Sequence, residues 1–371
     1  MRLSTFLSFK VLVVSKAFAE GYNTCSHPWE RNCVLVHNGA DTCTTPSVRR
    51  EWRDLDDSEK KAFLDAVKCL SYMPHGDLVL TNATPGIPAY DIRSSKYDDF
   101  VYTHMDTNVK DHFTAWDSVF LPWHRWYLLH LKKRCGTNVA SRVHFRSGIG
   151  QEFEDAEAGI QNSSIFNSST THGIGTLGNS ATNYSVTDGV FWDVKRAYPE
   201  PHTTKRNYTT HPFKTQTFPF TFTDVEMSAS MAFMPEKVDE LIMGSAGNYT
   251  DFQYKMDGER AQGMHNAAHL MMQGDLGNPL WSPNDVLFWM HHAHLDCIWA
   301  RWQANKTENA MAFGGGLTQN LTFYDLHPVG SAPDASLDSE LPTSGLAGSG
   351  PVYVRDMMNT KGAGLCYRCA F

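Results

Sequence analysis

Apolar residues recur at helical spacing in several parts of the chain, and the first such part has a polar start signal. Asp56-Asp-Ser-Glu59 has the form of a capping box. Phe63, Val67 and Leu70 follow at intervals of four and three residues, which predicts an amphipathic helix that ends near Pro74.

Two further helices are predicted between residues 97 and 136. Residues 97–104 place Phe100 and His104 on or near one side of a helix, and the same pattern continues beyond them. In the next helix Pro122 marks the first turn, and Gly136 is a stop signal.

A third pattern covers residues 265–303. His265 and His269 are four apart, so a helix places both imidazoles on one face. Ser282 is suited to an N-cap and Pro283 to the first helical position, and Asp285 can close a capping box. We therefore predict a helix that begins there and runs through Trp299 toward Trp302.

The other stretches favour loops. Turn residues, or a lack of hydrophobic periodicity, predict loops in four ranges: 20–46, 75–96, 137–220 and 330–350. We expect cysteines to staple the first loop, and long loops with short strands in residues 137–220. Residues 221–245 regain helical spacing, and Val352-Tyr-Val354 predicts an edge strand. The fold class expected from these patterns is mainly α, with long loops and few short strands.

Histidines gather on the predicted helices in two groups, which indicates that these helices carry a chemical site. The first group is His104, His112, His124 and His130, and the second is His265, His269, His291, His292 and His294. The five histidines of the second group lie within thirty residues beside Trp, Phe and Met, which favours metal binding over the alternative of hydrogen-bonded core histidines. The two groups predict two metal ions, or one ion with spare histidines, inside a four-helix bundle.

The ligand type narrows the choice of metal. Sites made only of imidazole suit Cu, Zn, Fe and Ni. Asn266 stands where the H-E-x-x-H motif of zinc peptidases has its glutamate, so the general base of that reaction is missing. The residues therefore disfavour zinc-dependent hydrolysis.

Charge and targeting signals indicate the location of the protein and the partners that it is expected to lack. The 371 residues carry a formal charge of −8 without a basic run, so we expect no nucleic-acid surface. A basic start, an apolar run and Ala17-Phe-Ala19 predict a secretory signal over residues 1–19, with an amphipathic helix as the alternative. No later apolar run is long enough to span a bilayer. Eight glycosylation sequons are present, at Asn82, Asn162, Asn167, Asn183, Asn207, Asn248, Asn305 and Asn320.

The eight cysteines lie mainly at the two ends of the chain. Five are within the first 135 residues and two are at Cys366 and Cys369. This distribution predicts disulfides that tie the termini to the body, with the connectivity left open. Cys297 lies inside the last predicted histidine helix, and we expect it to be a buried free thiol.

Two motifs resemble the copper motifs of the tyrosinase/catechol oxidase family. They are Phe120-Leu-Pro-Trp-His124-Arg and Ser282-Pro-Asn-Asp285 with the following Phe288-Trp-Met-His291-His292-Ala-His-Leu-Asp296. Tyr97-Asp-Asp-Phe-Val, Phe153-Glu-Asp155 and Thr187-Asp-Gly189 are smaller similarities. The resemblance covers roughly residues 45–305 and is greatest to short secreted fungal members.

The resemblance implies two copper ions per chain. It assigns His104, His112 and His124 to the first ion and His265, His269 and His292 to the second. His291 and His294 would then be neighbours of the ligands, and His130 a packing residue.

Further residues receive roles from the same resemblance. Asp296 would orient a ligand imidazole, Arg125 would pair with an acidic group, and Phe288 would pack at the substrate pocket. Asn266, with Asp257 or Glu259 as the acid, would hold the water that removes a phenol proton.

Three departures from the family pattern are visible. The usual spacing would place the second ligand of the first site at Ala115, whereas the nearby histidine is His112. A Pro-Tyr-Trp-Asp-Trp-like segment is replaced by Arg142–Gly148. Lys110 stands where some members carry a cysteine linked to a ligand, so we expect no such link.

The implied activity is copper-dependent oxidation of o-diphenols to o-quinones with O2, and Asn266 would also permit hydroxylation of monophenols. The alternatives are an inactive or single-copper relative and an oxygen-binding type 3 copper protein. The implied organisation is a signal peptide at 1–19, a catalytic domain at 20–330 and a C-terminal extension at 331–371 packed on that domain. We expect a secreted protein that meets small phenols and O2, with no nucleic-acid or membrane partner.

Overall fold

A computed structural model describes residues 43–76, 84–110, 118–135, 159–215, 222–257, 262–316, 334–343, 345–346, 351–362 and 364–370. Several features predicted above lie outside these ranges: the signal at 1–19, most of the loop at 20–46, His112, Ala115, Gly136, Arg142–Gly148, Phe153–Asp155, Glu259, and the sequons at Asn82 and Asn320.

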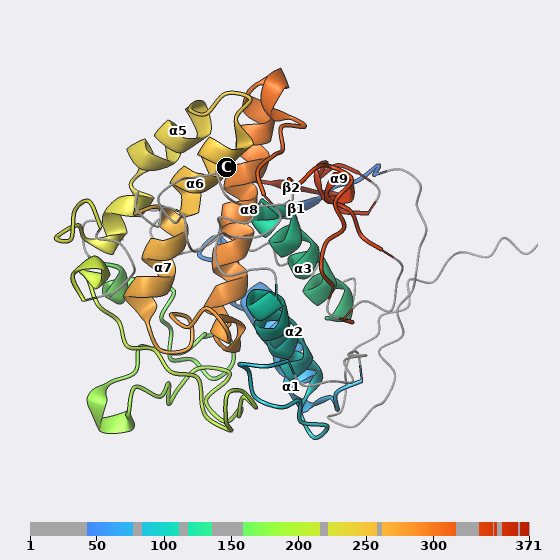
Figure 1. The fold of residues 1–371 in the computed structure, drawn as a ribbon. Coiled ribbons are helices and arrows are strands. Elements are labelled where there is room, and N and C mark those ends of the chain that lie inside the picture. The colour runs from blue at the N-terminus through green and yellow to red at the C-terminus, as the bar shows by residue number, and fades with distance from the viewer. Residues whose placement is uncertain are drawn as a thin grey trace, which may run out of the picture.

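Helix α8 is the element on which the others pack. It spans Leu287–Asn305, and its residues from Leu287 to Trp299 are buried on every side. A helix that is buried all round forms the core of a protein. Helices α3 and α7 both pack against α8, which runs through the middle of the molecule in Figure 1.

The other elements surround this helix. In chain order they are β1 (Ser47–Arg49), α1 (Asp57–Tyr72), α2 (Lys96–Lys110), α3 (Phe120–Arg134), α5 (Pro235–Met243), α6 (Tyr249–Asp257), α7 (Met264–Met272), α9 (Val354–Met357) and β2 (Tyr367–Cys369). Short 3-10 turns lie at Ile160–Asn162, Ser180–Thr182, Pro212–Lys214, Ala229–Phe233, Ser282–Asn284 and Thr307–Asn309. The prediction of a mainly α fold is confirmed, and the four-helix arrangement of the bundle remains a prediction.

The local signals for α1 act as predicted. Asp56 accepts a hydrogen bond from the Glu59 amide, and the Glu59 side chain accepts one from the Asp56 amide. The helix buries Phe63, Val67 and Leu70 and packs against α2. A capping box satisfies two amides that the first turn would otherwise leave without partners.

The predicted start of α8 was four residues too early. Ser282–Asn284 forms a separate 3-10 turn, Asp285 has an extended backbone, and α8 begins at Leu287. The Asp285 carboxylate accepts two hydrogen bonds from Arg206, at 2.7 and 2.8 Å, and one from the Leu287 amide. Arg206, which is far away in sequence, therefore holds Asp285 just before the helix, and the Asp285 carboxylate caps the first amide of α8.

Arg206 also orders the long segment 159–215. Its guanidinium donates to the carbonyls of Ile174, Gly175 and Thr176 in addition to Asp285. The described part of this segment forms turns, short 3-10 helices and two isolated β-bridges, Ser185–Lys205 and Arg196–His202, in place of the short strands that the composition suggested. The buried pair therefore fixes a loop-rich segment on the start of α8.

The described residues near the C-terminus pair with those that begin the described part of the chain. Strand β2 pairs in parallel with β1, with Val48 opposite Arg368. Disulfides join Cys43 to Cys366 and Cys297 to Cys369. The prediction that disulfides tie the termini to the body is confirmed, whereas the prediction of a free thiol at Cys297 was wrong because Cys369 reaches it from the end of the chain.

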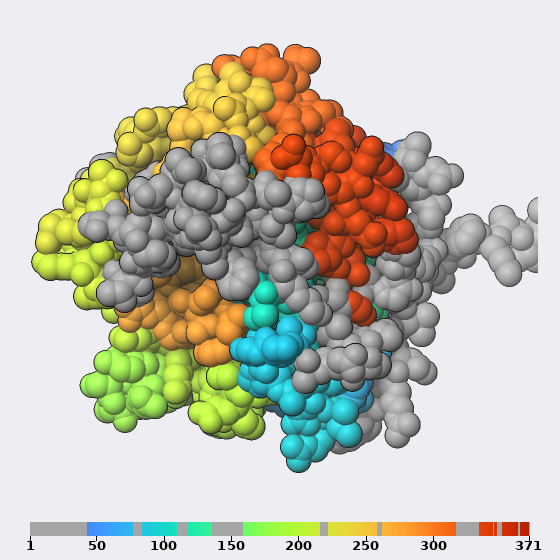
Figure 2. All heavy atoms as spheres, viewed as in Figure 1, coloured from blue at the N-terminus to red at the C-terminus, as the bar shows by residue number. Residues whose placement is uncertain are grey.

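The described residues between 334 and 370 lie on α3 and α8 rather than beyond them. The indole of Trp123 donates to the Pro342 carbonyl at 2.7 Å, and α9 packs against α3. In the view of Figure 2, these residues (red) lie against the orange surface of the α8 region. The predicted edge strand at 352–354 was wrong, because Asp356 binds the Tyr353 amide and Val354 begins α9.

No helix in the described residues is long and apolar enough to cross a membrane.

Replacing Arg206 with Met should lower the free energy of unfolding by about 3–5 kcal/mol, because the buried Asp285 carboxylate loses its charge partner. Urea unfolding followed by circular dichroism measures this. The matched control is Lys61→Met, which breaks the exposed Lys61–Asp65 pair and should cost about 1 kcal/mol or less. Equal losses in the two variants would contradict the structural role given to Arg206.

Candidate metal centre

Helices α2, α3, α7 and α8 bring the predicted ligands together. His104 comes from α2, His124 from α3, His265 and His269 from α7, and His292 from α8. The rings of His124 and His292 are parallel within 9° at 4.0 Å, and His265 lies 4.6 Å from His269 and 5.3 Å from His292. The His104 ring is 6.0 Å from that of His124. Five of the six predicted ligands therefore form one cluster, and the sixth, His112, is outside the described residues.

Hydrogen bonds fix the orientation of four of these rings. Nδ1 of His104 contacts the Leu280 carbonyl at 2.8 Å, and Nδ1 of His124 contacts the Phe120 carbonyl at 2.9 Å. Nδ1 of His269 lies 2.6 Å from the Leu276 carbonyl.

The fourth ring, His265, has its Nδ1 2.5 Å from Oδ1 of Asp257. Carbonyls and carboxylates only accept hydrogen bonds, so each of the four Nδ1 atoms carries the proton and each Nε2 keeps a lone pair. This is the tautomer that binds a metal through Nε2.

Burial keeps the imidazoles neutral. It lowers the pKa of His104 to about 4 and the pKa values of His265 and His269 to about 3. Burial also lowers the pKa values of His291 and His292 well below their usual range. Neutral imidazole is the form that binds metal, so the cluster needs no proton release at neutral pH.

The structure brings His291 closer to the second site than the sequence suggested. The ligand atoms of His265, His269 and His291 lie within 4.8 Å of one another. His292 approaches from the same helix, with Nε2 3.3 Å from Nε2 of His269. Two imidazole nitrogens about 2.0–2.1 Å from one tetrahedral ion are roughly 3.3 Å apart, so the His269–His292 pair fits a shared ion.

His292 also differs from His291 in what it touches. Its ring contacts His124 of the first group and both histidines of α7, whereas among the described ligands the His291 ring contacts His265, His269 and His292. His292 therefore lies between the two groups of histidines.

Two phenylalanines wrap the cluster. Phe288, fully buried one turn before His292, lies 4.2 Å from that ring and 5.2 Å from His104. Phe120, one turn before His124, lies 4.5 Å from His124 and 4.7 Å from His265. This geometry is compatible with the packing role predicted for Phe288. The contact between Phe120 and His265 brings together residues of α3 and α7, and no local sequence pattern predicts it.

The carboxylate that orients an imidazole is Asp257, not Asp296. Asp257 ends α6 and holds Nδ1 of His265. Its predicted role beside Asn266 at a water remains a prediction, since this contact uses only one of the two carboxylate oxygens. Asn266 is on α7, and the described residues offer its side-chain nitrogen no hydrogen bond.

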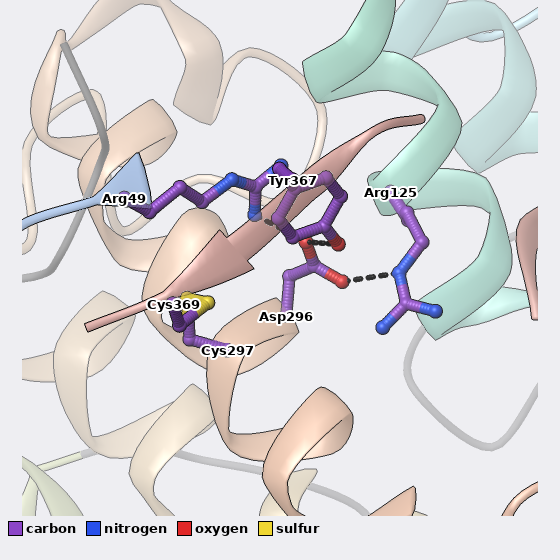
Figure 3. The surroundings of a disulfide bond; sticks show 6 residues. All are labelled: Arg49, Arg125, Asp296, Cys297, Tyr367 and Cys369. Carbon is purple, nitrogen blue, oxygen red and sulfur yellow. Dashed lines mark hydrogen bonds and ion pairs between the residues drawn. A yellow bond between two sulfur atoms is a disulfide. The ribbon is translucent and has the colours of Figure 1, made fainter. Parts of the chain in front are cut away.

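Asp296 instead binds the residues around the Cys297–Cys369 disulfide. Figure 3 shows its carboxylate between Arg125, Arg49 and Tyr367. Arg125 Nε donates to Oδ1 at 2.5 Å, while Arg49 and Tyr367 donate to Oδ2. The predicted acidic partner of Arg125 is thus Asp296, and the prediction that Asp296 orients an imidazole was wrong because three other donors occupy its oxygens.

The charge balance at Asp296 favours the ionised form. Burial raises the pKa of this carboxyl, but Arg125 and Arg49 outweigh burial and hold the pKa below its usual range. The Arg125 guanidinium also lies 3.7 Å from the Trp299 ring and donates to the Met357 carbonyl. Because Arg125 follows His124 and Asp296 is one turn after His292, this ion pair ties the two ligand-bearing helices together.

The other histidines have different surroundings. His130 is buried on α3 with its ring 4.6 Å from Trp126, as a packing residue would be. His294 is buried on α8.

These observations define a class of protein: a helical scaffold around a buried candidate metal centre whose ligands are all imidazoles. Residues 94–305 match the common central domain of tyrosinase, which is more than half of the chain. The chain therefore belongs to the tyrosinase family, whose members carry a type 3 copper centre.

Individual relatives agree with this assignment. The tyrosinase-like protein phomQ2 of Diaporthe leptostromiformis is 30% identical over 335 residues, covering 88% of this chain and 73% of its own. N-acetyl-6-hydroxytryptophan oxidase ivoB of Emericella nidulans is 25% identical and covers 87% and 92% of the two chains. A mutant polyphenol oxidase from Thermothelomyces thermophila shares the fold, with a TM-score of 0.61, 20% identity and coverage of 87% and 88%.

Replacing Asp257 with Asn should weaken copper binding at the second site by about 10- to 100-fold, because the neutral amide makes the His265 imidazole less basic. Competition with a chromophoric copper chelator measures the affinity. Asp251→Asn is the control, since Asp251 lies on the same helix but pairs with the exposed Lys255. Unchanged affinity in the Asp257 variant would refute the orienting role.

Proposed function

We propose that this protein is a copper-dependent oxidase that converts catechols to o-quinones with O2. The observation that carries the proposal is the cluster of buried neutral histidines, four of which have Nδ1 held by the protein so that Nε2 is available. A pair of copper ions, when bound, supplies the two-electron chemistry that reduces O2 and oxidises the diphenol. The name of the relative ivoB, an oxidase of a hydroxylated tryptophan, supports an aromatic hydroxyl substrate.

The ligand assignment follows the motif resemblance. His104, His112 and His124 would hold the first ion, and His265, His269 and His292 the second. The short contact between His269 and His292 supports His292 over His291. His291 would then pack beside the second ion, where its ring lies parallel to that of His265.

The remaining residues would position the substrate and its proton. Phe288 and Phe120 lie against the imidazoles and would exclude water around a planar ring. Asn266 would bind the water that accepts a monophenol proton. Asp257, through the carboxylate oxygen that does not hold His265, or Glu259 would supply the acid that makes this water basic.

We further propose that the protein is secreted, with the signal, domain and extension boundaries at residues 19 and 330. The two disulfides support this, because such bonds persist mainly in oxidising compartments. The sequons at Asn167, Asn183 and Asn248 are exposed, as glycan sites must be.

Oxygen uptake by the copper-loaded full chain tests the function. With 4-tert-butylcatechol the protein should consume O2 and form the quinone, and His269→Ala should abolish both because one ion loses a ligand. Tyrosine as the second substrate separates hydroxylation from diphenol oxidation. A copper-loaded chain that consumes no O2 with either substrate would contradict the proposal and favour an inactive or oxygen-binding relative.

Alanine variants of His291 and His292 test which of these two adjacent histidines binds the second copper ion. His292→Ala should lower the copper content from two ions toward one per chain, whereas His291→Ala should keep both ions, because it removes only a packing contact. Copper is counted by atomic absorption after gel filtration. The opposite result would move the ligand assignment to His291.

A further inference from the structure

His202, in the long segment 159–215, faces a carboxylate of the turn that follows α7. Its Nε2 lies 2.8 Å from Oδ1 of Asp275, and its Nδ1 lies 2.7 Å from the Glu200 carbonyl oxygen. The side chains of His202 and Asp275 are only 13% and 3% exposed. This largely buried pair therefore joins two parts of the chain that are 73 residues apart.

Both nitrogens of the His202 ring face oxygens that accept hydrogen bonds. A carbonyl is only an acceptor, so Nδ1 carries a proton. Asp275 also accepts hydrogen bonds from the Lys205 amide at 2.8 Å and from Nδ2 of Asn284 at 3.2 Å, which is the arrangement of an ionised carboxylate. Nε2 then has to donate as well, so only the imidazolium form of His202 satisfies both contacts at once.

The charges around the His202 ring agree with this protonated form. Burial lowers the pKa of His202, and so does the Lys205 ammonium, but Asp275 and the Glu200 carbonyl outweigh them and raise the pKa above its usual value. Three further charged residues of the elements that meet here bind other groups: Arg196, Arg206 and Asp285. Because the usual pKa of imidazole is about 6.5, His202 loses its proton only above that pH.

Asp275 connects this ring to the metal centre. The next residue in the chain is Leu276, whose carbonyl lies 2.6 Å from Nδ1 of His269, a predicted ligand of the second copper ion. The Asp275 amide in turn donates to the Lys205 carbonyl at 3.0 Å, so the turn is bound to the long segment through both its backbone and its side chain. The contact between His202 and Asp275 therefore helps to place the carbonyl that orients His269.

We propose that His202 is a positioning residue for the second copper site, and that this site binds copper more tightly when His202 is protonated. The proposal rests on the function proposed above, which makes His269 a ligand. Loss of the proton removes a donor from the His202 ring, weakens its hold on Asp275 and loosens the Leu276 carbonyl from Nδ1 of His269.

The sign of the pH dependence follows from the raised pKa. A group whose pKa is raised by folding stabilises its folded contacts below the usual pKa, and this contribution is lost as the pH rises through the folded value. Copper affinity at the second site should therefore fall as the pH rises above 6.5, the usual pKa of imidazole. Histidine sites that must release protons show the opposite trend.

Two variants separate the charge of His202 from its bulk. His202→Gln keeps one amide donor for Asp275 but has no charge and no proton to lose, whereas His202→Arg keeps a positive charge at every pH of the experiment. The matched control is His172→Gln, because His172 belongs to the same segment but lies 3.7 Å from an exposed carboxylate, that of Asp57 on α1.

The first measurement is a pH titration of the copper-free full chain, labelled with 15N in its histidine rings, by NMR. His202 should titrate above pH 6.5, and the ring signals of His269 should change with the same midpoint in the parent and in His172→Gln. In His202→Gln this change at His269 should be absent. A His202 ring that is neutral at pH 6, or that titrates without any effect on His269, would overturn the proposal.

The second measurement is copper affinity at pH 6 and pH 8, by competition with a chromophoric chelator. His202→Gln should bind the second ion about three- to tenfold more weakly than the parent at pH 6, which is less than for a residue that touches a ligand directly, and equally at pH 8. His202→Arg should keep the affinity of the parent at pH 6 and exceed it at pH 8. Equal pH trends in the parent and in His202→Gln would overturn the proposal. If the parent binds no copper at either pH, the proposed function fails, and the titration of the copper-free chain still decides whether His202 positions His269.

Discussion

The burial of many imidazoles in one apolar volume is the constraint on which the rest of the structure depends. A charged imidazolium would be costly there, so the rings stay neutral and each needs a partner for one nitrogen. The carbonyls of Leu280, Phe120 and Leu276 and the carboxylate of Asp257 supply these partners. For these four rings the surrounding protein thus decides which nitrogen faces the centre before any metal binds.

The same constraint explains why α8 is anchored so firmly. An apolar helix carrying histidines has no preferred rotation of its own, so buried charges fix it. Asp285 with Arg206 holds its beginning, and Asp296 with Arg125 holds its middle against α3. The Cys297–Cys369 disulfide adds a covalent link to β2, whose Tyr367 also reaches Asp296. The C-terminal residues therefore support the ligand-bearing helices from outside.

Local signals in the sequence were enough for α1, α2, α3, α7 and most of α8, and for the clustered histidines that these helices carry, but they did not reveal α6 or α9. The capping box at Asp56 and the four-residue spacing of His265 and His269 each act within one turn, and each is confirmed in the structure. What could not be predicted depends on residues far apart in sequence. Arg206 displaces the start of α8, Cys369 pairs with Cys297, and only the packing of α6 against α7 decides that Asp257 rather than Asp296 faces an imidazole.

The central claim is that histidines of α2, α3, α7 and α8 hold two copper ions side by side. An anomalous difference map at the copper absorption edge, from crystals of the copper-loaded chain, tests it most directly. The account predicts two peaks roughly 3.5–4 Å apart, one beside His104 and His124 and one beside His265, His269 and His292. A single peak, or a second peak away from these rings, would contradict it.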